Sequence, residues 1–135
     1  DMSMPFCPKT RPIIVEELKN QGLSVRDKAV LLCTEGPRFE TPAEIEMFHR
    51  LGCDIVGMTS VTEAILSREL EMCYTAICFI TNMAAGMQKS ITPSDVFVIS
   101  KNVSKQLEQA LIATIAALPL KRSCTCSKAL KESRF

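Results

Sequence analysis

The 135-residue chain has the length of one ordinary globular domain, and 47% hydrophobic with 23% charged residues exclude a disordered or fibrous protein. Its 16 basic and 15 acidic residues leave a formal net charge of +1, which excludes attraction to nucleic acid or anionic membranes by charge alone. We therefore expect its partner to occupy a pocket.

Membrane insertion and secretion are also not indicated. No apolar run approaches the roughly 20 residues of a membrane span. The best run, residues 72–80, is short and interrupted by Thr75. The N-terminus lacks the basic and then apolar order of a signal peptide. We expect a cytoplasmic protein with neither a nucleic-acid nor a membrane partner.

Helical and strand patterns alternate along the chain, which is typical of an α/β fold. Helices are expected at about residues 12–21, 42–51, 61–71 and 93–118, and strands at 29–33, 55–58 and 73–81. The run 73–81 is apolar on both faces, as buried parallel strands are. The last helix has the clearest periodicity, starting at Pro93 and ending before Pro119. Its expected apolar stripe is Val96, Ile99, Val103, Leu107, Ala110, Leu111, Ile115 and Leu118.

Polar residues follow each expected strand, at the edge where open α/β sheets bind ligands. Phe39 and Glu40 precede a helix start at Thr41, and Asn82 begins the loop after the third strand. Together these three side chains suit a flat heterocycle, with Phe39 against the ring and the carboxylate and amide at its edge. The plainer alternatives are a solvated Glu40 and a turn-forming Asn82.

The second edge runs from Met58 into a helix expected to be capped at Ser60. Its unpaired backbone N–H groups and the Thr59 hydroxyl suit an oxyanion, although every capped helix offers as much. Met58 alone is more typical of a core than of a ligand contact. His49, the only histidine, favours packing or an interface, because no nucleophile accompanies it.

Six of the seven cysteines fall into two groups. Cys33, Cys53, Cys73 and Cys78 lie in apolar surroundings and are expected to be small buried side chains. Cys124 and Cys126 lie in a polar, basic tail, where a redox-active or structural disulfide stays open. No second pair has metal-finger spacing, so no metal site is predicted.

Three motifs, Glu-Gly-Pro-Arg-Phe-Glu-Thr at 35–41, Leu-Gly-Cys-Asp-Ile-Val-Gly-Met-Thr at 51–59 and Thr-Asn-Met-Ala-Ala-Gly at 81–86, stand in this order. They resemble the C-terminal half of the trimeric purine nucleoside phosphorylase and methylthioadenosine phosphorylase family, over about residues 4–118. The resemblance implies a three-layer α/β fold with a mixed central sheet flanked by helices. Residues 1–120 would form the C-terminal half of that domain, and residues 121–135 a Cys-x-Cys tail. The tail looks archaeal or thermophilic, which favours a disulfide.

The resemblance implies phosphorolysis, in which inorganic phosphate attacks a purine nucleoside and releases the base and ribose 1-phosphate. It assigns phosphate and ribose binding to Thr59, a contact with the ribose to Met58, an unspecified substrate contact to Gly57, and stacking on the purine to Phe39. It assigns the base edge to Glu40 and Asn82, with Asn82 as the catalytic residue that stabilises the leaving base. Phosphate would be a co-substrate, with no cofactor or metal, in a homotrimer or hexamer.

Specificity is read at two positions. Family members that prefer 6-amino purines have Asp at the positions of Asn82 and Ala84, so Asn82 favours 6-oxopurines such as inosine or guanosine. Pro93 stands about where relatives have a histidine near the 5′ end of the sugar, which favours 5′-methylthioinosine. The alternatives are a 5′-methylthioadenosine phosphorylase and a non-catalytic purine-binding remnant, because the family's N-terminal phosphate loop has no counterpart in the printed sequence.

Overall fold

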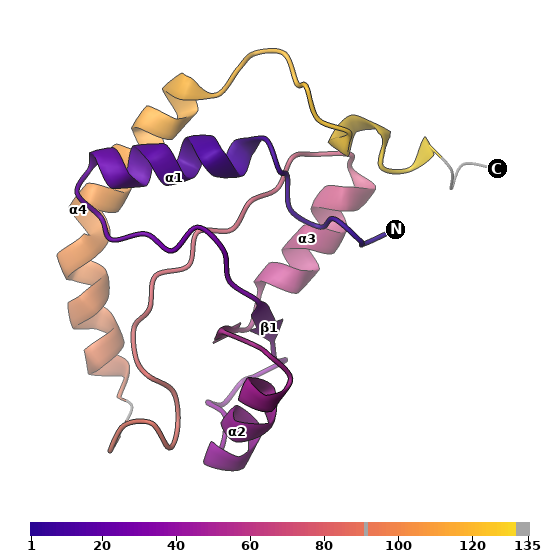
Figure 1. Ribbon diagram of the computed structural model, residues 1–135. Coiled ribbons are helices and arrows are strands. Elements are labelled where there is room, and N and C mark those ends of the chain that lie inside the picture. The colour runs from indigo at the N-terminus through magenta and orange to yellow at the C-terminus, as the bar shows by residue number, and fades with distance from the viewer. Residues whose placement is uncertain (91, 132–135) are drawn as a thin grey trace. The chain divides into compact units, whose positions relative to one another are not determined.

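The computed structural model describes residues 1–90 and 92–131, apart from the side chains of residues 93 and 95 (Figure 1). All four expected helices are present, each starting within two residues of its predicted position. The elements in chain order are α1 (Thr10–Asn20), β1 (Leu31–Cys33), α2 (Pro42–Arg50), β2 (Ile55–Gly57), α3 (Ser60–Glu69), α4 (Pro93–Ala117) and the short 3-10 helix η1 (Cys126–Lys128).

The chain forms two compact units. The first contains residues 1–27, 59–77 and 106–135, and the second contains residues 28–58 and 78–105. Helix α4 contributes its second half to the first unit and its first half to the second.

A parallel strand pair organises the second unit. β1 pairs with β2 in the register Leu31 to Ile55, Leu32 to Val56 and Cys33 to Gly57. The N–H of Thr34 continues the ladder to the carbonyl of Gly57 at 2.9 Å. Helix α2 connects the two strands, so both end at the same edge of the sheet. The predicted meeting of these two strand ends is confirmed.

The predicted third strand is wrong. Residues 73–81 form no strand in the part of the chain that the structure describes. A strand needs a neighbouring backbone to accept and donate its ladder of hydrogen bonds, and apolar composition alone does not supply one. The carbonyl of Tyr74 instead accepts a hydrogen bond from the N–H of Cys7, at 2.7 Å.

The first unit contains α1, α3 and the second half of α4. Its buried side chains are Cys7, Leu18, Ala64, Ala110, Thr114 and Cys126. Nε2 of Gln106 donates to the carbonyl of Gln21, at 3.4 Å, which ties α4 to the end of α1.

The predicted apolar stripe of α4 is partly wrong. Ala110 and its polar neighbour Thr114 are buried, whereas Leu111 and Ile115 are 42% and 72% exposed. This helix carries more apolar residues than one face can cover, so periodicity does not determine which of them are covered.

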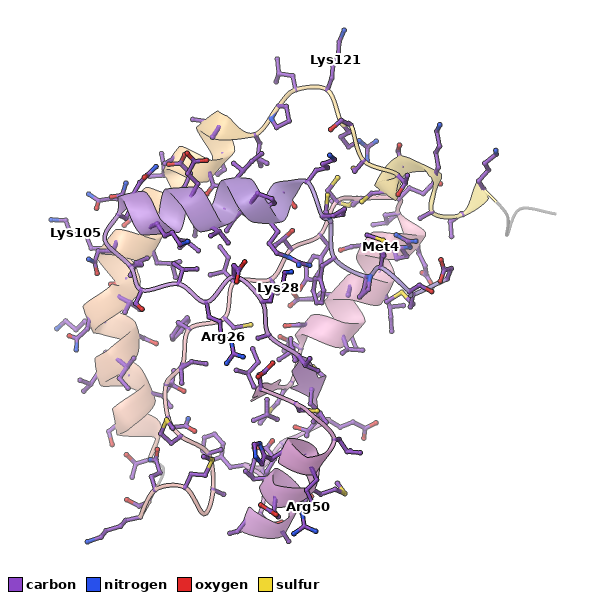
Figure 2. The ribbon with its side chains drawn as sticks, viewed as in Figure 1. Met4, Arg26, Lys28, Arg50, Lys105 and Lys121 are labelled. Carbon is purple, nitrogen blue, oxygen red and sulfur yellow. The ribbon has the colours of Figure 1, made fainter. Side chains whose placement is uncertain are left out.

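Many large apolar side chains in the described residues lie at the surface, including Leu120 and Phe97. None of the helices that the structure describes combines the length and apolar character needed to cross a membrane. Polar side chains also extend from the helices, and Arg50 projects from the end of α2, where its Nε lies 2.8 Å from Oε1 of Glu46 (Figure 2).

Candidate functional site

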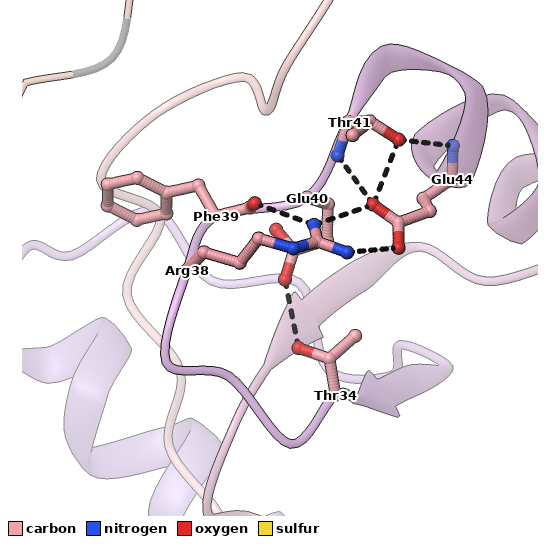
Figure 3. A network of polar contacts seen from close by, with 6 residues as sticks. All are labelled: Thr34, Arg38, Phe39, Glu40, Thr41 and Glu44. Atoms are coloured by element: carbon pink, nitrogen blue, oxygen red, sulfur yellow. Dashed lines mark hydrogen bonds and ion pairs between the residues drawn. The ribbon is translucent and has the colours of Figure 1, made fainter.

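Glu40 is held at the sheet edge where β1 and β2 end. The Thr34 hydroxyl donates to Oε1 of Glu40 at 2.9 Å (Figure 3). Thr34 is itself fixed, because its N–H extends the strand ladder to Gly57. The half-buried Glu40 carboxylate therefore has a defined position relative to the strands. A carboxylate that already accepts a neutral hydroxyl keeps lone pairs for a ligand N–H group.

The loop before α2 is braced by a second carboxylate. Arg38 contacts both oxygens of Glu44, with Nη1 to Oε2 at 2.9 Å and Nη2 to Oε1 at 2.8 Å. The N–H of Thr41 also donates to Oε2 of Glu44, at 2.7 Å, and the Glu44 N–H returns a bond to the Thr41 hydroxyl at 3.3 Å. This capping box confirms the helix start predicted at Thr41 (Figure 3).

The same contacts keep both Glu44 and Arg38 ionised. Hydrogen bonds from Arg38, and then from the backbone and hydroxyl of Thr41, lower the pKa of Glu44 to about 2. The Glu44 carboxylate in turn raises the pKa of Arg38. Arg38 also donates to the Phe39 carbonyl at 3.0 Å, so its guanidinium spans the loop that presents Phe39. We infer that Arg38 is structural, because its donors hold the loop.

Two apolar side chains are accessible in this region of the second unit. Phe39 is 45% exposed and Met58, which follows β2, is 39% exposed. A Cβ atom at Gly36 would lie 3.0 Å from Sδ of Met58, so the glycine lets the loop approach this side chain closely. Gly36 also has a φ of 74°, which favours glycine. Phe39 and Met58 thus offer apolar surface for a flat ring.

Asn82 lies in a loop that reaches the start of α2. A Cβ atom at Gly86 would lie 2.9 Å from Cβ of Pro42, so the loop after residue 81 packs directly against this helix. The Asn82 amide is engaged within its own loop, donating to the Thr81 hydroxyl at 2.9 Å and accepting from the N–H of Ala84 at 3.0 Å.

The described residues show no hydrogen bond between Glu40 and Asn82. The two loops that carry them approach each other through Pro42 and Gly86. The shared contact of the two side chains with one base therefore stays a prediction.

Thr59 precedes α3 as its N-cap residue, not Ser60 as expected, and its side chain makes no capping hydrogen bond. Its carbonyl accepts from the Thr62 hydroxyl at 2.7 Å. Thr59 is exposed and its hydroxyl is not used to cap the helix. Pro93 is the first residue of α4, and its side chain lies outside the described part of the structure.

Sequence reasoning missed the residues that position Glu40. The spacing of Thr41 and Glu44 is a recognisable capping signal. Nothing in the pattern marks Thr34 as the partner of Glu40 or Arg38 as the partner of Glu44, because these contacts depend on how the loop turns back.

Comparison with known proteins identifies the family. The model of the family described as the phosphorylase superfamily matches residues 1–117. The chain belongs to the phosphorylase superfamily. This phosphorylase-superfamily chain is 44% identical over 132 residues to the 6-oxopurine nucleoside phosphorylase of Pyrococcus furiosus, covering 97% of this chain and 50% of that protein. It is 43% identical to the probable S-methyl-5′-thioinosine phosphorylase of Methanopyrus kandleri, covering 97% and 52%.

Solved structures confirm the nucleoside phosphorylase fold predicted for the chain. The methylthioadenosine phosphorylase of Schistosoma mansoni in complex with adenine is 24% identical, with a TM-score of 0.87 over 98% of this chain and 54% of that one. A methylthioadenosine phosphorylase from an Antarctic soil metagenomic library is also 24% identical, with a TM-score of 0.78. The chain spans about half the length of the curated relatives it matches.

Proposed function

We propose that this chain supplies the base-binding part of an enzyme that phosphorolyses 6-oxopurine nucleosides. The observation that carries the proposal is the Glu40 carboxylate, which Thr34 fixes at the carboxyl edge of the strand pair, one residue after the exposed Phe39. In the reaction, phosphate oxygen bonds to the anomeric carbon while the bond from that carbon to the purine nitrogen breaks. The purine leaves with the bonding electrons. Phosphate is the co-substrate, and the proposal includes no cofactor.

Base recognition follows from hydrogen-bond chemistry. A 6-oxopurine carries a ring N–H next to its oxo group, and the Glu40 carboxylate can accept from it. The Asn82 amide would turn its NH2 from Thr81 to the oxo oxygen and N7, where negative charge develops as the base leaves. The names of the Pyrococcus furiosus and Methanopyrus kandleri relatives support this choice, since both specify a 6-oxopurine base.

Sugar and phosphate contacts are assigned by resemblance. Thr59 would contact phosphate and ribose, and its hydroxyl is available because it does not cap α3. Gly57 would contact the substrate and Met58 would line the sugar. Pro93 at its 5′ end would favour a methylthio group over a hydroxyl, so 5′-methylthioinosine is the preferred substrate. The alternative, 5′-methylthioadenosine, is supported by the Schistosoma mansoni protein of similar structure, which is a methylthioadenosine phosphorylase.

The test measures base binding and turnover separately. Hypoxanthine and adenine binding is measured by calorimetry, and phosphate-dependent base release is followed with inosine, 5′-methylthioinosine and 5′-methylthioadenosine. Glu40→Gln should weaken hypoxanthine binding at least about tenfold, because loss of one hydrogen bond to a charged partner costs that much or more. Asn82→Asp should do the same and favour adenine.

Glu46→Gln is the matched control. Glu46 is an exposed carboxylate on α2 that pairs with Arg50, away from the loop that holds Glu40. Its substitution should leave binding unchanged. Equal affinities of the Glu40→Gln and Glu46→Gln variants for hypoxanthine would contradict the proposed base site.

The second candidate is a non-catalytic purine-binding protein, favoured by the half-length match to the relatives. Binding of hypoxanthine that does not depend on phosphate, without base release, supports this candidate. Co-expression with the complementary half of the Pyrococcus furiosus relative provides a further test. Phosphate-dependent release of hypoxanthine from inosine or 5′-methylthioinosine by the mixture, lost in the Asn82→Asp variant, supports the enzyme.

We also propose a cytoplasmic homo-oligomer, a trimer or hexamer. None of the seven cysteines is joined to another by a disulfide, and unpaired cysteines suit a reducing compartment. The exposed apolar residues support burial against further copies. Light scattering coupled to size-exclusion chromatography measures the assembled mass.

A further inference from the structure

Four cysteine side chains meet in the first unit, although they come from separate parts of the chain. The Sγ atoms of Cys7, Cys73, Cys124 and Cys126 all lie within 4.8 Å of one another. Cys7 precedes α1, Cys73 follows α3, and the other two lie in the tail, with Cys126 starting η1. Cys7 and Cys126 are 1% and 6% exposed, so the cluster is largely shielded from solvent.

The spacing of the sulfur atoms suits a tetrahedral ion. Zinc binds thiolate at about 2.3 Å, which places neighbouring sulfurs of a tetrahedron about 3.8 Å apart. The Sγ atoms of Cys73 and Cys124 are 3.4 Å apart, and every other pair lies within 4.8 Å. Shifts of a fraction of an ångström would therefore bring four sulfurs to one centre.

The three segments are held together by contacts that do not involve sulfur. The Cys7 N–H donates to the Tyr74 carbonyl at 2.7 Å. The Arg122 guanidinium donates to the Glu71 carbonyl at 2.8 Å, and the Leu130 N–H donates to the Glu71 carboxylate at 3.2 Å. These bonds hold the segment before α1 and the tail against the segment after α3. The fold therefore brings the four cysteines together without any bond between their sulfur atoms.

Donors also surround one of the sulfurs. The backbone N–H groups of Thr10 and Lys9 donate to the Cys7 sulfur, as outer contacts do around metal-bound ligands.

We propose that Cys7, Cys73, Cys124 and Cys126 form a closed structural site for Zn²⁺. Binding replaces the protons of the thiols with the ion and gives a complex of four thiolates with a net charge of −2, without oxidation or reduction. All four positions of the ion are filled by protein, so the site has no place for substrate and takes no part in phosphorolysis. Its role is to fasten the tail to the rest of the first unit.

Sequence spacing did not indicate this site. Structural zinc sites are recognised by two short-spaced pairs of ligands, and here only Cys124 and Cys126 are close in sequence. Of the other two ligands, Cys73 was expected to be a small buried side chain, and no sequence pattern marks Cys7 as a ligand.

The test uses chain that is purified and reduced under anaerobic conditions. Zn²⁺ is titrated in competition with a chromophoric chelator, and Co²⁺ is used as a spectroscopic probe. We expect one ion per chain, intense visible Co²⁺ bands of a tetrahedral site, and sulfur-to-metal charge transfer. Cys124→Ser should weaken Zn²⁺ binding at least about 100-fold, since losing even an outer-shell partner costs up to that factor.

Cys53→Ser is the matched control, because Cys53 is a half-buried cysteine outside the cluster and should leave Zn²⁺ binding unchanged. Circular dichroism of each variant confirms that it folds. Cys124→Ser is the primary variant, because Cys124 is half-buried in the tail, whereas Cys7 is buried and its substitution risks preventing folding.

Three results would overturn the proposal. The first is an absence of tight Zn²⁺ binding by the reduced wild-type chain. The second is equal Zn²⁺ affinity in the Cys124→Ser and Cys53→Ser variants. The third is a disulfide within the cluster in protein whose thiols were blocked at cell lysis, because oxidised sulfurs cannot ligate the ion.

Discussion

Two carboxylates, Glu40 in the loop before α2 and Glu44 in the first turn of that helix, have different surroundings. Both oxygens of Glu44 are engaged by Arg38, and Oε2 also accepts from Thr41. Glu40 accepts from the neutral hydroxyl of Thr34. A ligand N–H would have to displace a charged partner at Glu44 but not at Glu40, so Glu40 is the better acceptor. The resemblance to the family indicated Glu40 as the carboxylate that binds the base. The hydrogen bonds around Glu40 and Glu44 give a physical reason to prefer Glu40 for this role.

Glu44 should titrate at an unusually low pH. The pKa of Glu44 in the folded chain, about 2, is below the roughly 4.3 of an unfolded chain. The ionised Glu44 therefore contributes its full stabilisation, through Arg38 and Thr41, above a pH of about 4.3. This stabilisation is lost as the pH falls through about 2. Carboxyl NMR of Glu44 measures the midpoint directly.

Arg38→Gln should raise the Glu44 midpoint, since it removes the largest cause of the shift. Arg50→Gln is the matched control, because it removes an ion pair with Glu46 on the same helix. An unchanged Glu44 midpoint in the Arg38→Gln variant would show that the pair does not form in solution.

Thr114 should limit the stability of the first unit. Its side chain is buried and its hydroxyl has no hydrogen-bond partner within the described structure. Thr114→Val keeps the shape and removes the buried hydroxyl, and we expect it to stabilise the chain by about 1 kcal/mol. Urea unfolding measures the change. Thr114→Ser, which keeps the hydroxyl and removes a methyl group, should be destabilising; a gain in the serine variant would refute the explanation.

At the scale of elements, local chemistry predicted the helices well. Thr41 and Glu44 form the expected capping box, and Gly22 and Gly52 follow helix ends with positive φ values. The prediction of a strand at residues 73–81 was wrong, because a strand forms only where a second strand from elsewhere in the chain pairs with it. The residues that determine a helix lie within the helix itself. A strand also needs a pairing strand, which its own sequence does not specify.

The loop that carries Asn82 should be sensitive to substitution of Gly86. Gly86 and Gly22 have similar φ values of 84° and 74°, so alanine costs about 1 kcal/mol of backbone strain at either position. The Cβ added at Gly86 would collide with Pro42, whereas the Cβ added at Gly22 would meet open space. Gly86→Ala should therefore lower the free energy of unfolding more than Gly22→Ala. Equal losses in urea unfolding would mean that this loop does not pack against α2.

At the scale of the whole molecule, the sequence predicted the class of fold but not the long-range contacts. The motifs at 35–41, 51–59 and 81–86 indicated the family, because each is a compact local signature. The cysteine cluster needed the structure, since its members come from three segments that are far apart in the sequence. Pairwise spacing detects a site only where the ligands are close along the chain.

The outer face of α4 should mediate self-association. Ile112 and Ile115 are 62% and 72% exposed on this helix, which is costly for a single copy in water. We expect the wild-type chain to elute above its 14.9 kDa monomer mass, and Ile115→Glu to shift it towards the monomer because a charge cannot be buried unpaired. Gln109→Glu adds the same charge at an exposed polar position of α4 and should leave the mass unchanged. If both variants dissociate equally, added charge rather than loss of apolar contact is responsible, and this face of α4 is not the interface.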